Sequence, residues 1–196
     1  MNPLLRAGGI AASVILIVVG VGAIVIGMSG RSEVANDLKR EAITGTPDMT
    51  PKLIAAAVKE ANLKITDLPT CTVANQPVNN GARAKCFASY MRIHALEGTG
   101  GRVYAQMGQY LDKAGKETSD KAQAAVDPKT GQPVPNAARN VWVTQTALGT
   151  ALNTSYFAQQ VALFSIIMGI ALLLTGIGFL VLTGVGLREG SAKPGS

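Results

Sequence analysis

The sequence predicts an all-α membrane protein with two transmembrane helices and a mainly helical, disulfide-stapled extracytoplasmic domain. Three observations predict this class: two long stretches carry no charged residue, the segment between them is polar and interrupted by turn residues, and that segment holds the only two cysteines. The expected order is a cytoplasmic tail, a span, an outer domain, a second span and a second cytoplasmic tail. These parts cover residues 1–6, 7–30, 31–160, 161–187 and 188–196.

Each uncharged stretch is long enough to cross a bilayer as a helix. The centre of the first, Ile10 to Ile26, is almost wholly aliphatic residues and glycine, and the centre of the second runs from Phe164 to Leu182. A hydrocarbon core needs about 20 apolar residues in helical form, because lipid offers the backbone no hydrogen-bond partners. A cleaved signal peptide is the alternative for the first stretch, but its apolar run exceeds the usual h-region of about 7–15 residues. We expect an uncleaved signal-anchor.

The short tails indicate the orientation. The first carries Arg6 and the free amine, and the second carries Arg188 and Lys193 against Glu189, so both are net positive. Positive tails stay in the cytoplasm, whereas long domains cross the membrane largely regardless of charge. The sequence therefore predicts a plasma-membrane protein with both termini cytoplasmic and residues 31–160 on the outer side.

The outer domain has mixed charge and one candidate cross-link. Between Arg31 and Arg139 there are 15 basic and 11 acidic residues, without the clustering of a nucleic-acid interface, so no nucleic-acid partner is expected. In an oxidising compartment Cys71 and Cys86 are most simply a disulfide, worth about 3 kcal/mol in the chain-entropy model. Free thiols and a redox role are the alternatives. The single histidine, His94, is too little to complete a zinc site, and no cofactor is expected.

Local signals place helices in the outer domain. Ser32–Ile43 is expected to be a polar helix, and Thr50 is the expected N-cap of a second helix that begins at Pro51. A third helix is expected at Ala82–Glu97. One side of this third helix carries Cys86, Tyr90 and Ile93.

The later part of the outer domain is less regular. Val103–Leu111 favours a short helix over a strand, and Asp112–Pro135 has the composition of a surface loop. From Asn136 one helix is expected to run into the second span. It carries Val141, Leu148 and Leu152 at helical spacing.

The approach to the second span has an unusual composition. No residue from Asn140 to Gln160 is charged, and Thr, Gln, Asn, Ala and Gly take the place of Lys and Glu. Such a surface suits close packing, either on helices of the same outer domain or on a partner protein. Tyr156 and Phe157 suit the membrane–water interface at the outer side.

The spans offer candidate packing residues but no chemistry. Neither span holds an Asp, Glu, Lys, Arg or His, which argues against a transporter or pump. Pairs of small residues four apart promote helix association in lipid, either between the two spans or on a larger complex. These pairs are Ala23 with Gly27, Ser165 with Gly169, and Ala171 with Thr175. No catalytic residue is expected, since nothing in the sequence gives His94 an orienting carboxylate or a nucleophile.

Several strings together carry a family resemblance. They are EAITGTPDMTP from Glu41, RIHALE from Arg92, NVWVTQTA from Asn140 and LNTSYF from Leu152. The chain resembles a family of small actinobacterial two-span membrane proteins over nearly its whole length, and within that family it is similar to the respiratory supercomplex association factors. The resemblance implies an accessory subunit of the assembly that joins cytochrome bcc to cytochrome c oxidase, and it implies no catalytic residue.

The expected function is therefore that of a non-catalytic accessory subunit, not an enzyme, which binds an integral membrane complex and the lipid bilayer. The alternative is a membrane-anchored envelope enzyme or ligand-binding domain of unknown substrate. A deep pocket with convergent polar groups around His94 or Glu97 would favour that alternative. A third candidate is a self-associating structural protein.

Overall fold

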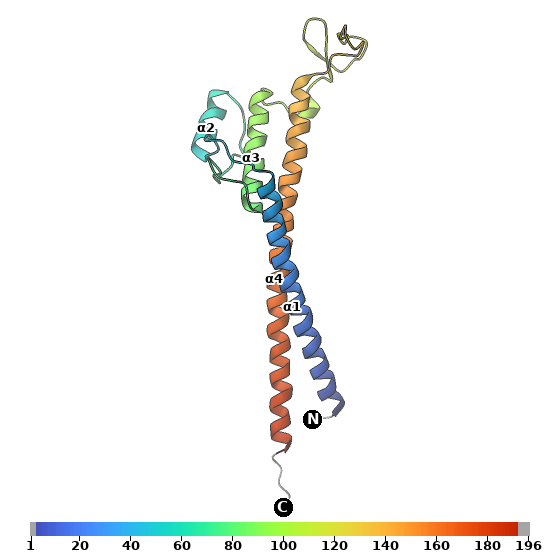
Figure 1. Cartoon of the computed structure of the whole chain (residues 1–196). Helices are drawn as coiled ribbons and strands as arrows, with labels where there is room; N and C mark the ends of the chain where they lie inside the picture. Colours follow the sequence, from blue (N-terminus) through green and yellow to red (C-terminus); the bar gives the residue numbers. More distant parts are fainter. Residues whose placement is uncertain (1–2, 192–196) are drawn as a thin grey trace, which may run out of the picture. The chain divides into compact units, whose positions relative to one another are not determined.

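The computed structural model describes residues 3–191 of the chain, with side chains for residues 4–184 (Figure 1). Within these residues it is mainly helical, which confirms that part of the predicted fold class. The elements are α1 Pro3–Arg40, α2 Pro51–Glu60, α3 Gly81–Gly98, the 3-10 turn η1 Tyr104–Gln106, β1 Tyr110–Leu111, β2 Glu117–Thr118 and α4 Ala137–Ser191. Of the predicted tails, residues 1–2 and 192–196, Lys193 included, lie outside the described residues.

The described chain forms two compact units. Residues 3–35 and 157–191 make the first unit, and residues 36–156 make the second. The divisions fall close to the expected ends of the outer domain at residues 31 and 160. Helices α1 and α4 each contribute to both units.

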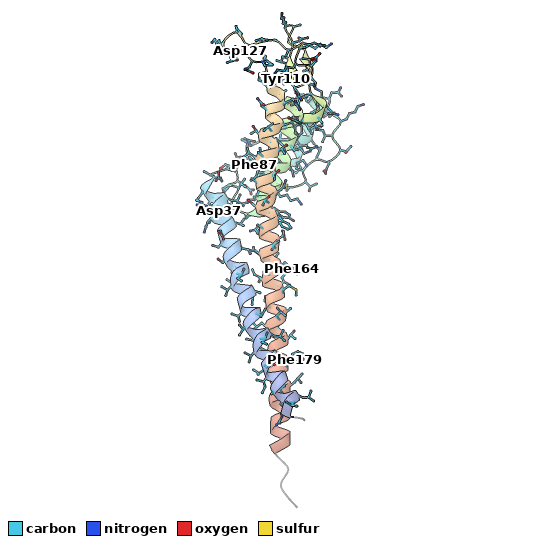
Figure 2. The ribbon with its side chains drawn as sticks, turned by 90° about the vertical axis from the view of Figure 1, so that its right-hand side faces the viewer. Asp37, Phe87, Tyr110, Asp127, Phe164 and Phe179 are labelled. Atoms are coloured by element: carbon cyan, nitrogen blue, oxygen red, sulfur yellow. A yellow bond between two sulfur atoms is a disulfide. The ribbon has the colours of Figure 1, made fainter. Side chains whose placement is uncertain are left out.

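The first unit consists of two antiparallel helical segments that lie side by side (Figure 1). By length and composition both α1 and α4 are able to cross a membrane, and only 11% of the most apolar window of each is buried. Large apolar side chains therefore cover the outside of this unit. Phe164 and Phe179, labelled in Figure 2, are 62% and 47% exposed.

A repeat of small residues holds the two segments close together. Ser13, Gly20 and Gly27 are buried on α1 at intervals of seven residues, and Ala162, Gly169 and Gly176 are buried on α4 at the same interval. A Cβ atom added to Gly20 would lie 2.8 Å from the carbonyl oxygen of Gly169, and one added to Gly27 would lie 2.6 Å from that of Ala162. The backbones thus touch directly at these positions, as a seven-residue repeat in a two-helix contact requires.

The second unit is built around a cluster of buried side chains between α2 and α3. Thr50 caps α2 by accepting a hydrogen bond from the Leu53 amide, and Asn80 caps α3 in the same way from Arg83. The predicted start at Pro51 is confirmed for α2, and α3 agrees with Ala82–Glu97 within one residue at each end. The cluster contains Met49, Ile54, Val58, Val73, Cys86, Tyr90 and Ile93. The side of α3 that carries Cys86, Tyr90 and Ile93 is therefore the buried one.

A second cluster joins α3 to the first turns of α4. Trp142 is 3% exposed and packs with Ala95, Leu96 and Met107. Its indole nitrogen donates to the carbonyl oxygen of Arg102 at 2.9 Å. Of the three residues noted at helical spacing, Leu152 is buried, but Val141 and Leu148 are 43% and 46% exposed, because Trp142 takes the inward position.

The segment between α3 and α4 differs from the prediction. Val103–Leu111 is not a helix: it contains only η1, and β1 then pairs antiparallel with β2. Asn136 draws the chain back by donating to the carbonyl oxygen of Gly108 at 3.0 Å, and it also accepts from the Ala138 amide at the start of α4. The bond between Asn136 and Gly108, which spans 28 residues of the chain, outweighs the weak helical preference of the segment. Figure 2 shows Asp127 at the far end of this loop and Tyr110 nearer its base.

The first polar helix is also placed differently. The predicted Ser32–Ile43 helix is the last part of α1, which runs without a break to Arg40. Ala42 follows with a φ of 51°, a left-handed conformation that ends the helix.

Candidate functional site

The predicted small-residue pairs of the spans divide into two groups. Gly27 and Gly169 are buried in the contact between α1 and α4, with Ala23 and Ser165 half-buried beside them. Ala171 and Thr175 are exposed, so their predicted role in packing the two spans together is wrong. The physical reason is the seven-residue repeat, which turns these two residues away from α1.

The exposed small residues form a patch of their own on α4. Thr175 bonds its hydroxyl to the carbonyl oxygen of Ala171 at 2.8 Å, so its side chain presents a methyl group rather than a free donor. A Cβ atom added to Gly178, one turn further on, would meet nothing within 4 Å. Ala171, Thr175 and Gly178 are therefore a smooth surface that remains available to lipid or to another helix.

The uncharged stretch of α4 in the second unit has a packed side and an open side. Trp142, Gly149 and Leu152 are buried on the packed side. The opposite side, here called the α4 outer face, consists of Asn140, Val143, Thr144, Ala147, Thr150, Ala151 and Thr154, all of them exposed. One side of this stretch therefore packs on the second unit itself. The other side is not covered by any part of the described chain and stays open to a partner protein.

A shallow groove lies beside the α4 outer face. It is mostly apolar, and its lining includes Met91, His94 and Ala95 from α3 and Val141 and Thr144 from α4. The residues that α4 contributes to this groove carry no charge. A groove of this kind offers van der Waals contact more than directed chemistry.

The two cysteines form the predicted disulfide. The bond joins Cys71 in the irregular segment before α3 to Cys86 on α3, with a sequence separation of 15 residues. Cys86 is 5% exposed and belongs to the first cluster. The Tyr90 hydroxyl donates to the carbonyl oxygen of Cys71 at 2.6 Å, and burial, with a further contribution from the charge of Asp48, raises the pKa of that hydroxyl. The disulfide and this hydrogen bond act on the same segment.

His94 has carboxylate neighbours that sequence reasoning missed. Its Nδ1 lies 3.0 Å from Oε2 of Glu97, and its Nε2 lies 3.1 Å from Oδ2 of Asp48. Glu97 is one helical turn away and was readable from the sequence, whereas Asp48 comes from the distant turn before α2. The contact with Glu97 is a hydrogen bond, whereas Nε2 makes no hydrogen bond and meets Asp48 only at ion-pair distance. The link between the turn and α3 is therefore electrostatic.

The carboxyl groups of Asp48 and Glu117 both have a lowered pKa. For Asp48 the main cause is the hydrogen bond from the Thr46 side chain, and the charge of His94 adds to it. For Glu117 the main cause is the side chain of Arg102, whose two terminal nitrogens lie 2.6 and 3.0 Å from the carboxylate oxygens. The pair of Asp48 with His94 and the pair of Glu117 with Arg102 each join two separate segments of the second unit, which indicates a structural role.

Two of the three basic residues Arg83, Lys85 and Arg92 of α3 lie over aromatic rings. The amine of Lys85 lies 4.6 Å from the centre of the Tyr156 ring, and the guanidinium of Arg92 lies 5.4 Å from the centre of the Trp142 ring. Arg83 bonds to the carbonyl oxygen of Pro77 and the side chain of Asn79. Phe157, the other predicted interfacial residue, is 67% exposed in the first unit.

Two cavities of the second unit have the same volume, about 460 Å³ each. One lies between residues 64–69, one side of α3 and residues 101–106, and neither His94 nor Glu97 lines it. The other is the groove beside the α4 outer face, which His94 lines and Glu97 does not. Among the described residues, no group of three or more His, Cys, Asp and Glu side chains has a geometry suited to a metal ion.

In comparisons with known proteins, no protein-family model, no curated protein and no solved structure matches this chain.

Proposed function

We propose that this chain is a non-catalytic accessory subunit that crosses the plasma membrane twice and docks on a large integral membrane complex. The observation that carries the proposal is the α4 outer face, which is exposed and uncharged over four turns. Solvated helix surfaces usually carry charged side chains, whereas surfaces that meet another protein are poor in Lys, Glu and Asp.

The first unit supports membrane insertion. Its apolar side chains are exposed rather than buried, in contrast to the core helices of a soluble protein. Lipid satisfies most of this surface, and the patch of Ala171, Thr175 and Gly178 suits close approach by a helix of the complex. The disulfide supports an oxidising, extracytoplasmic location for residues 31–160, with both termini in the cytoplasm.

The identity of the complex is proposed from the resemblance of four strings of the sequence to the supercomplex association factors. The partner is accordingly the respiratory assembly of cytochrome bcc and cytochrome c oxidase. Solubilising the membrane gently and isolating the chain through a tag tests this. Cytochrome subunits and a haem absorbance spectrum are expected in the eluate. A chain recovered alone, without haem-containing subunits, would contradict the proposal.

The orientation is testable on its own. In intact cells a membrane-impermeant maleimide is expected to label Thr130→Cys, which lies in the loop of the second unit, and to leave Leu5→Cys, in the proposed cytoplasmic tail, unlabelled until the membrane is opened. Equal labelling of both variants in intact cells would contradict the proposed topology.

A further inference from the structure

An irregular segment of the second unit has no backbone pairing. Residues 63–70 contain no helix, strand, turn or bend. Within the described chain, the backbone amides and carbonyls from Lys64 to Thr70 make no hydrogen bond. Both ends are held: the Leu63 amide donates to the carbonyl oxygen of Val58 at 3.0 Å, and Cys71 is tied by the disulfide and by Tyr90. The middle is thus an anchored irregular segment with free backbone donors and acceptors, here called the unpaired edge.

The unpaired edge runs along one of the two cavities of about 460 Å³. Residues 64–69 form one wall, α3 forms the second and residues 101–106 form the third, around a space of about 460 Å³. The lining includes Ile65 and Leu68 of the edge, Ile93 and Leu96 of α3, and Val103. That volume is within the range of sites that take side chains or small ligands, about 300–1,000 Å³. Charged and polar side chains complete the lining. Free backbone groups beside such a cavity suit a peptide that pairs along the unpaired edge and inserts one side chain.

The charges at the cavity are mainly positive and unpaired. Lys64 and Arg92 both line it, and within the described chain neither makes an ion pair with a carboxylate. Arg92 contacts only the Trp142 ring, which leaves its N–H donors unused. Asp67 also lines the cavity, so the net charge is positive by one. Two unpaired cations beside the apolar side chains of this lining favour an occupant with a carboxylate next to an apolar side chain.

We propose that this site receives an extended, acidic segment of a partner protein. The segment pairs with the backbone of Lys64–Leu68, inserts an apolar side chain between Ile93 and Val103, and places a carboxylate against Lys64 and Arg92. The inference rests on the proposed function, because it supplies a second point of attachment, independent of the α4 outer face, to the complex named there.

Site-specific photo-cross-linking in living cells tests the proposal. The photoreactive residue p-benzoylphenylalanine replaces Thr66, an exposed position on the edge. The same replacement at Thr130 is the matched control for an exposed threonine elsewhere in the second unit, and a replacement at Ala147 reports on the α4 outer face. The expected result is a protein adduct at Thr66 whose cross-linked peptide, mapped by mass spectrometry, contains Asp or Glu beside apolar residues, with no such adduct at Thr130.

A charge reversal tests the recognition itself. With the Thr66 probe in place, Lys64→Glu is expected to lower the adduct yield about fivefold or more, because an attraction becomes a repulsion. Lys59→Glu is the matched control, since Lys59 is exposed on α2 and does not line the cavity, and it should leave the yield unchanged. An unchanged tryptophan fluorescence spectrum for both variants shows that the fold is intact.

The outcomes separate the two proposals. An adduct at Ala147 without one at Thr66 leaves the proposed function standing and overturns this inference. The inference is likewise overturned by a Thr66 adduct with lipid, with a second copy of this chain or with a basic segment, and by a yield that does not respond to Lys64→Glu. Adducts at neither position count against both proposals.

Discussion

The first unit joins two helical segments at a repeat of small residues, whereas the second joins its elements with a disulfide, ion pairs and two apolar clusters. In the first, Gly20 and Gly169 bring the backbones into contact, and the large apolar side chains point outward. In the second, Tyr90 and Trp142 are buried and their polar atoms are bonded inside. The difference teaches where each unit draws its stability: the first from close backbone contact between helices, and the second from burial and cross-linking.

The largest expected effect falls on the second unit alone. Replacing both Cys71 and Cys86 with Ser removes the closure of a segment with a separation of 15 residues. We expect a loss of about 3 kcal/mol in the free energy of unfolding. The only tryptophan, Trp142, belongs to this unit, so its fluorescence during urea unfolding measures the change. An unchanged urea midpoint would show that burial alone holds the segment.

The next effect falls on the first unit alone. Gly27→Leu forces a side chain against the carbonyl oxygen of Ala162, which a Cβ atom would already approach to 2.6 Å. Overpacking of this kind costs about 1–3 kcal/mol. Spin labels at the exposed positions Val18 and Leu174 are expected to report a longer and broader distance distribution than in the unsubstituted chain.

The matched control for that change is Gly22→Leu, because a Cβ atom at Gly22 meets nothing within 4 Å. It should leave the spin–spin distance unchanged. If both variants separate the helices equally, the seven-residue repeat is not what holds them.

A smaller effect on the second unit is expected from Tyr90→Phe. The change keeps the buried ring but removes the hydrogen bond to the carbonyl oxygen of Cys71. The expected loss is about 1 kcal/mol in the free energy of unfolding, again followed by Trp142 fluorescence. A loss as large as that of the cysteine variants would mean that the hydroxyl, rather than the disulfide, dominates the anchoring of the segment.

The smallest effect is a dependence on pH that also belongs to the second unit. Because the pKa of Asp48 is lowered in the folded state, its contribution to stability is complete above the ordinary value of 3.8 and is lost as the pH falls through the lower folded value. The pKa of Glu117 is lowered from 4.5 in the same sense, mainly by Arg102. Stability should therefore fall on acidification, and less steeply in Asp48→Asn. Parallel pH profiles for the two chains would contradict this sign.

The sequence was most informative where a local signal coincided with burial. The Thr50 cap, the inward side of α3 and the cysteine pair needed only nearest-neighbour chemistry and the spacing of apolar residues. The seven-residue repeats of Ser13, Gly20 and Gly27 and of Ala162, Gly169 and Gly176 are also visible in the sequence. Pairs of small residues four apart include only Gly27 and Gly169 of these repeats, and they add Ala171 and Thr175, which face away from α1.

What could not be predicted depends on contacts between distant segments. A short turn and a strand take the place of the expected helix at Val103–Leu111. They are held by the hydrogen bond from Asn136 to Gly108 and by the pair of Arg102 with Glu117. The approach of Asp48 to His94 has the same origin. The unpaired edge at Lys64–Thr70 is invisible in a sequence, because free backbone groups leave no pattern of residue types.

The measurement that most directly tests docking through the α4 outer face is the haem recovered per tagged chain after gentle solubilisation. Ala147→Lys places a charge at the centre of that face, and Ala56→Lys makes the same change at an exposed position of α2. Both substitutions suit a helix, so neither should unfold the second unit. We expect Ala147→Lys to lower haem recovery about tenfold, because an unpaired charge would enter the interface, and Ala56→Lys to leave it unchanged. Equal recovery from the two variants would contradict the account.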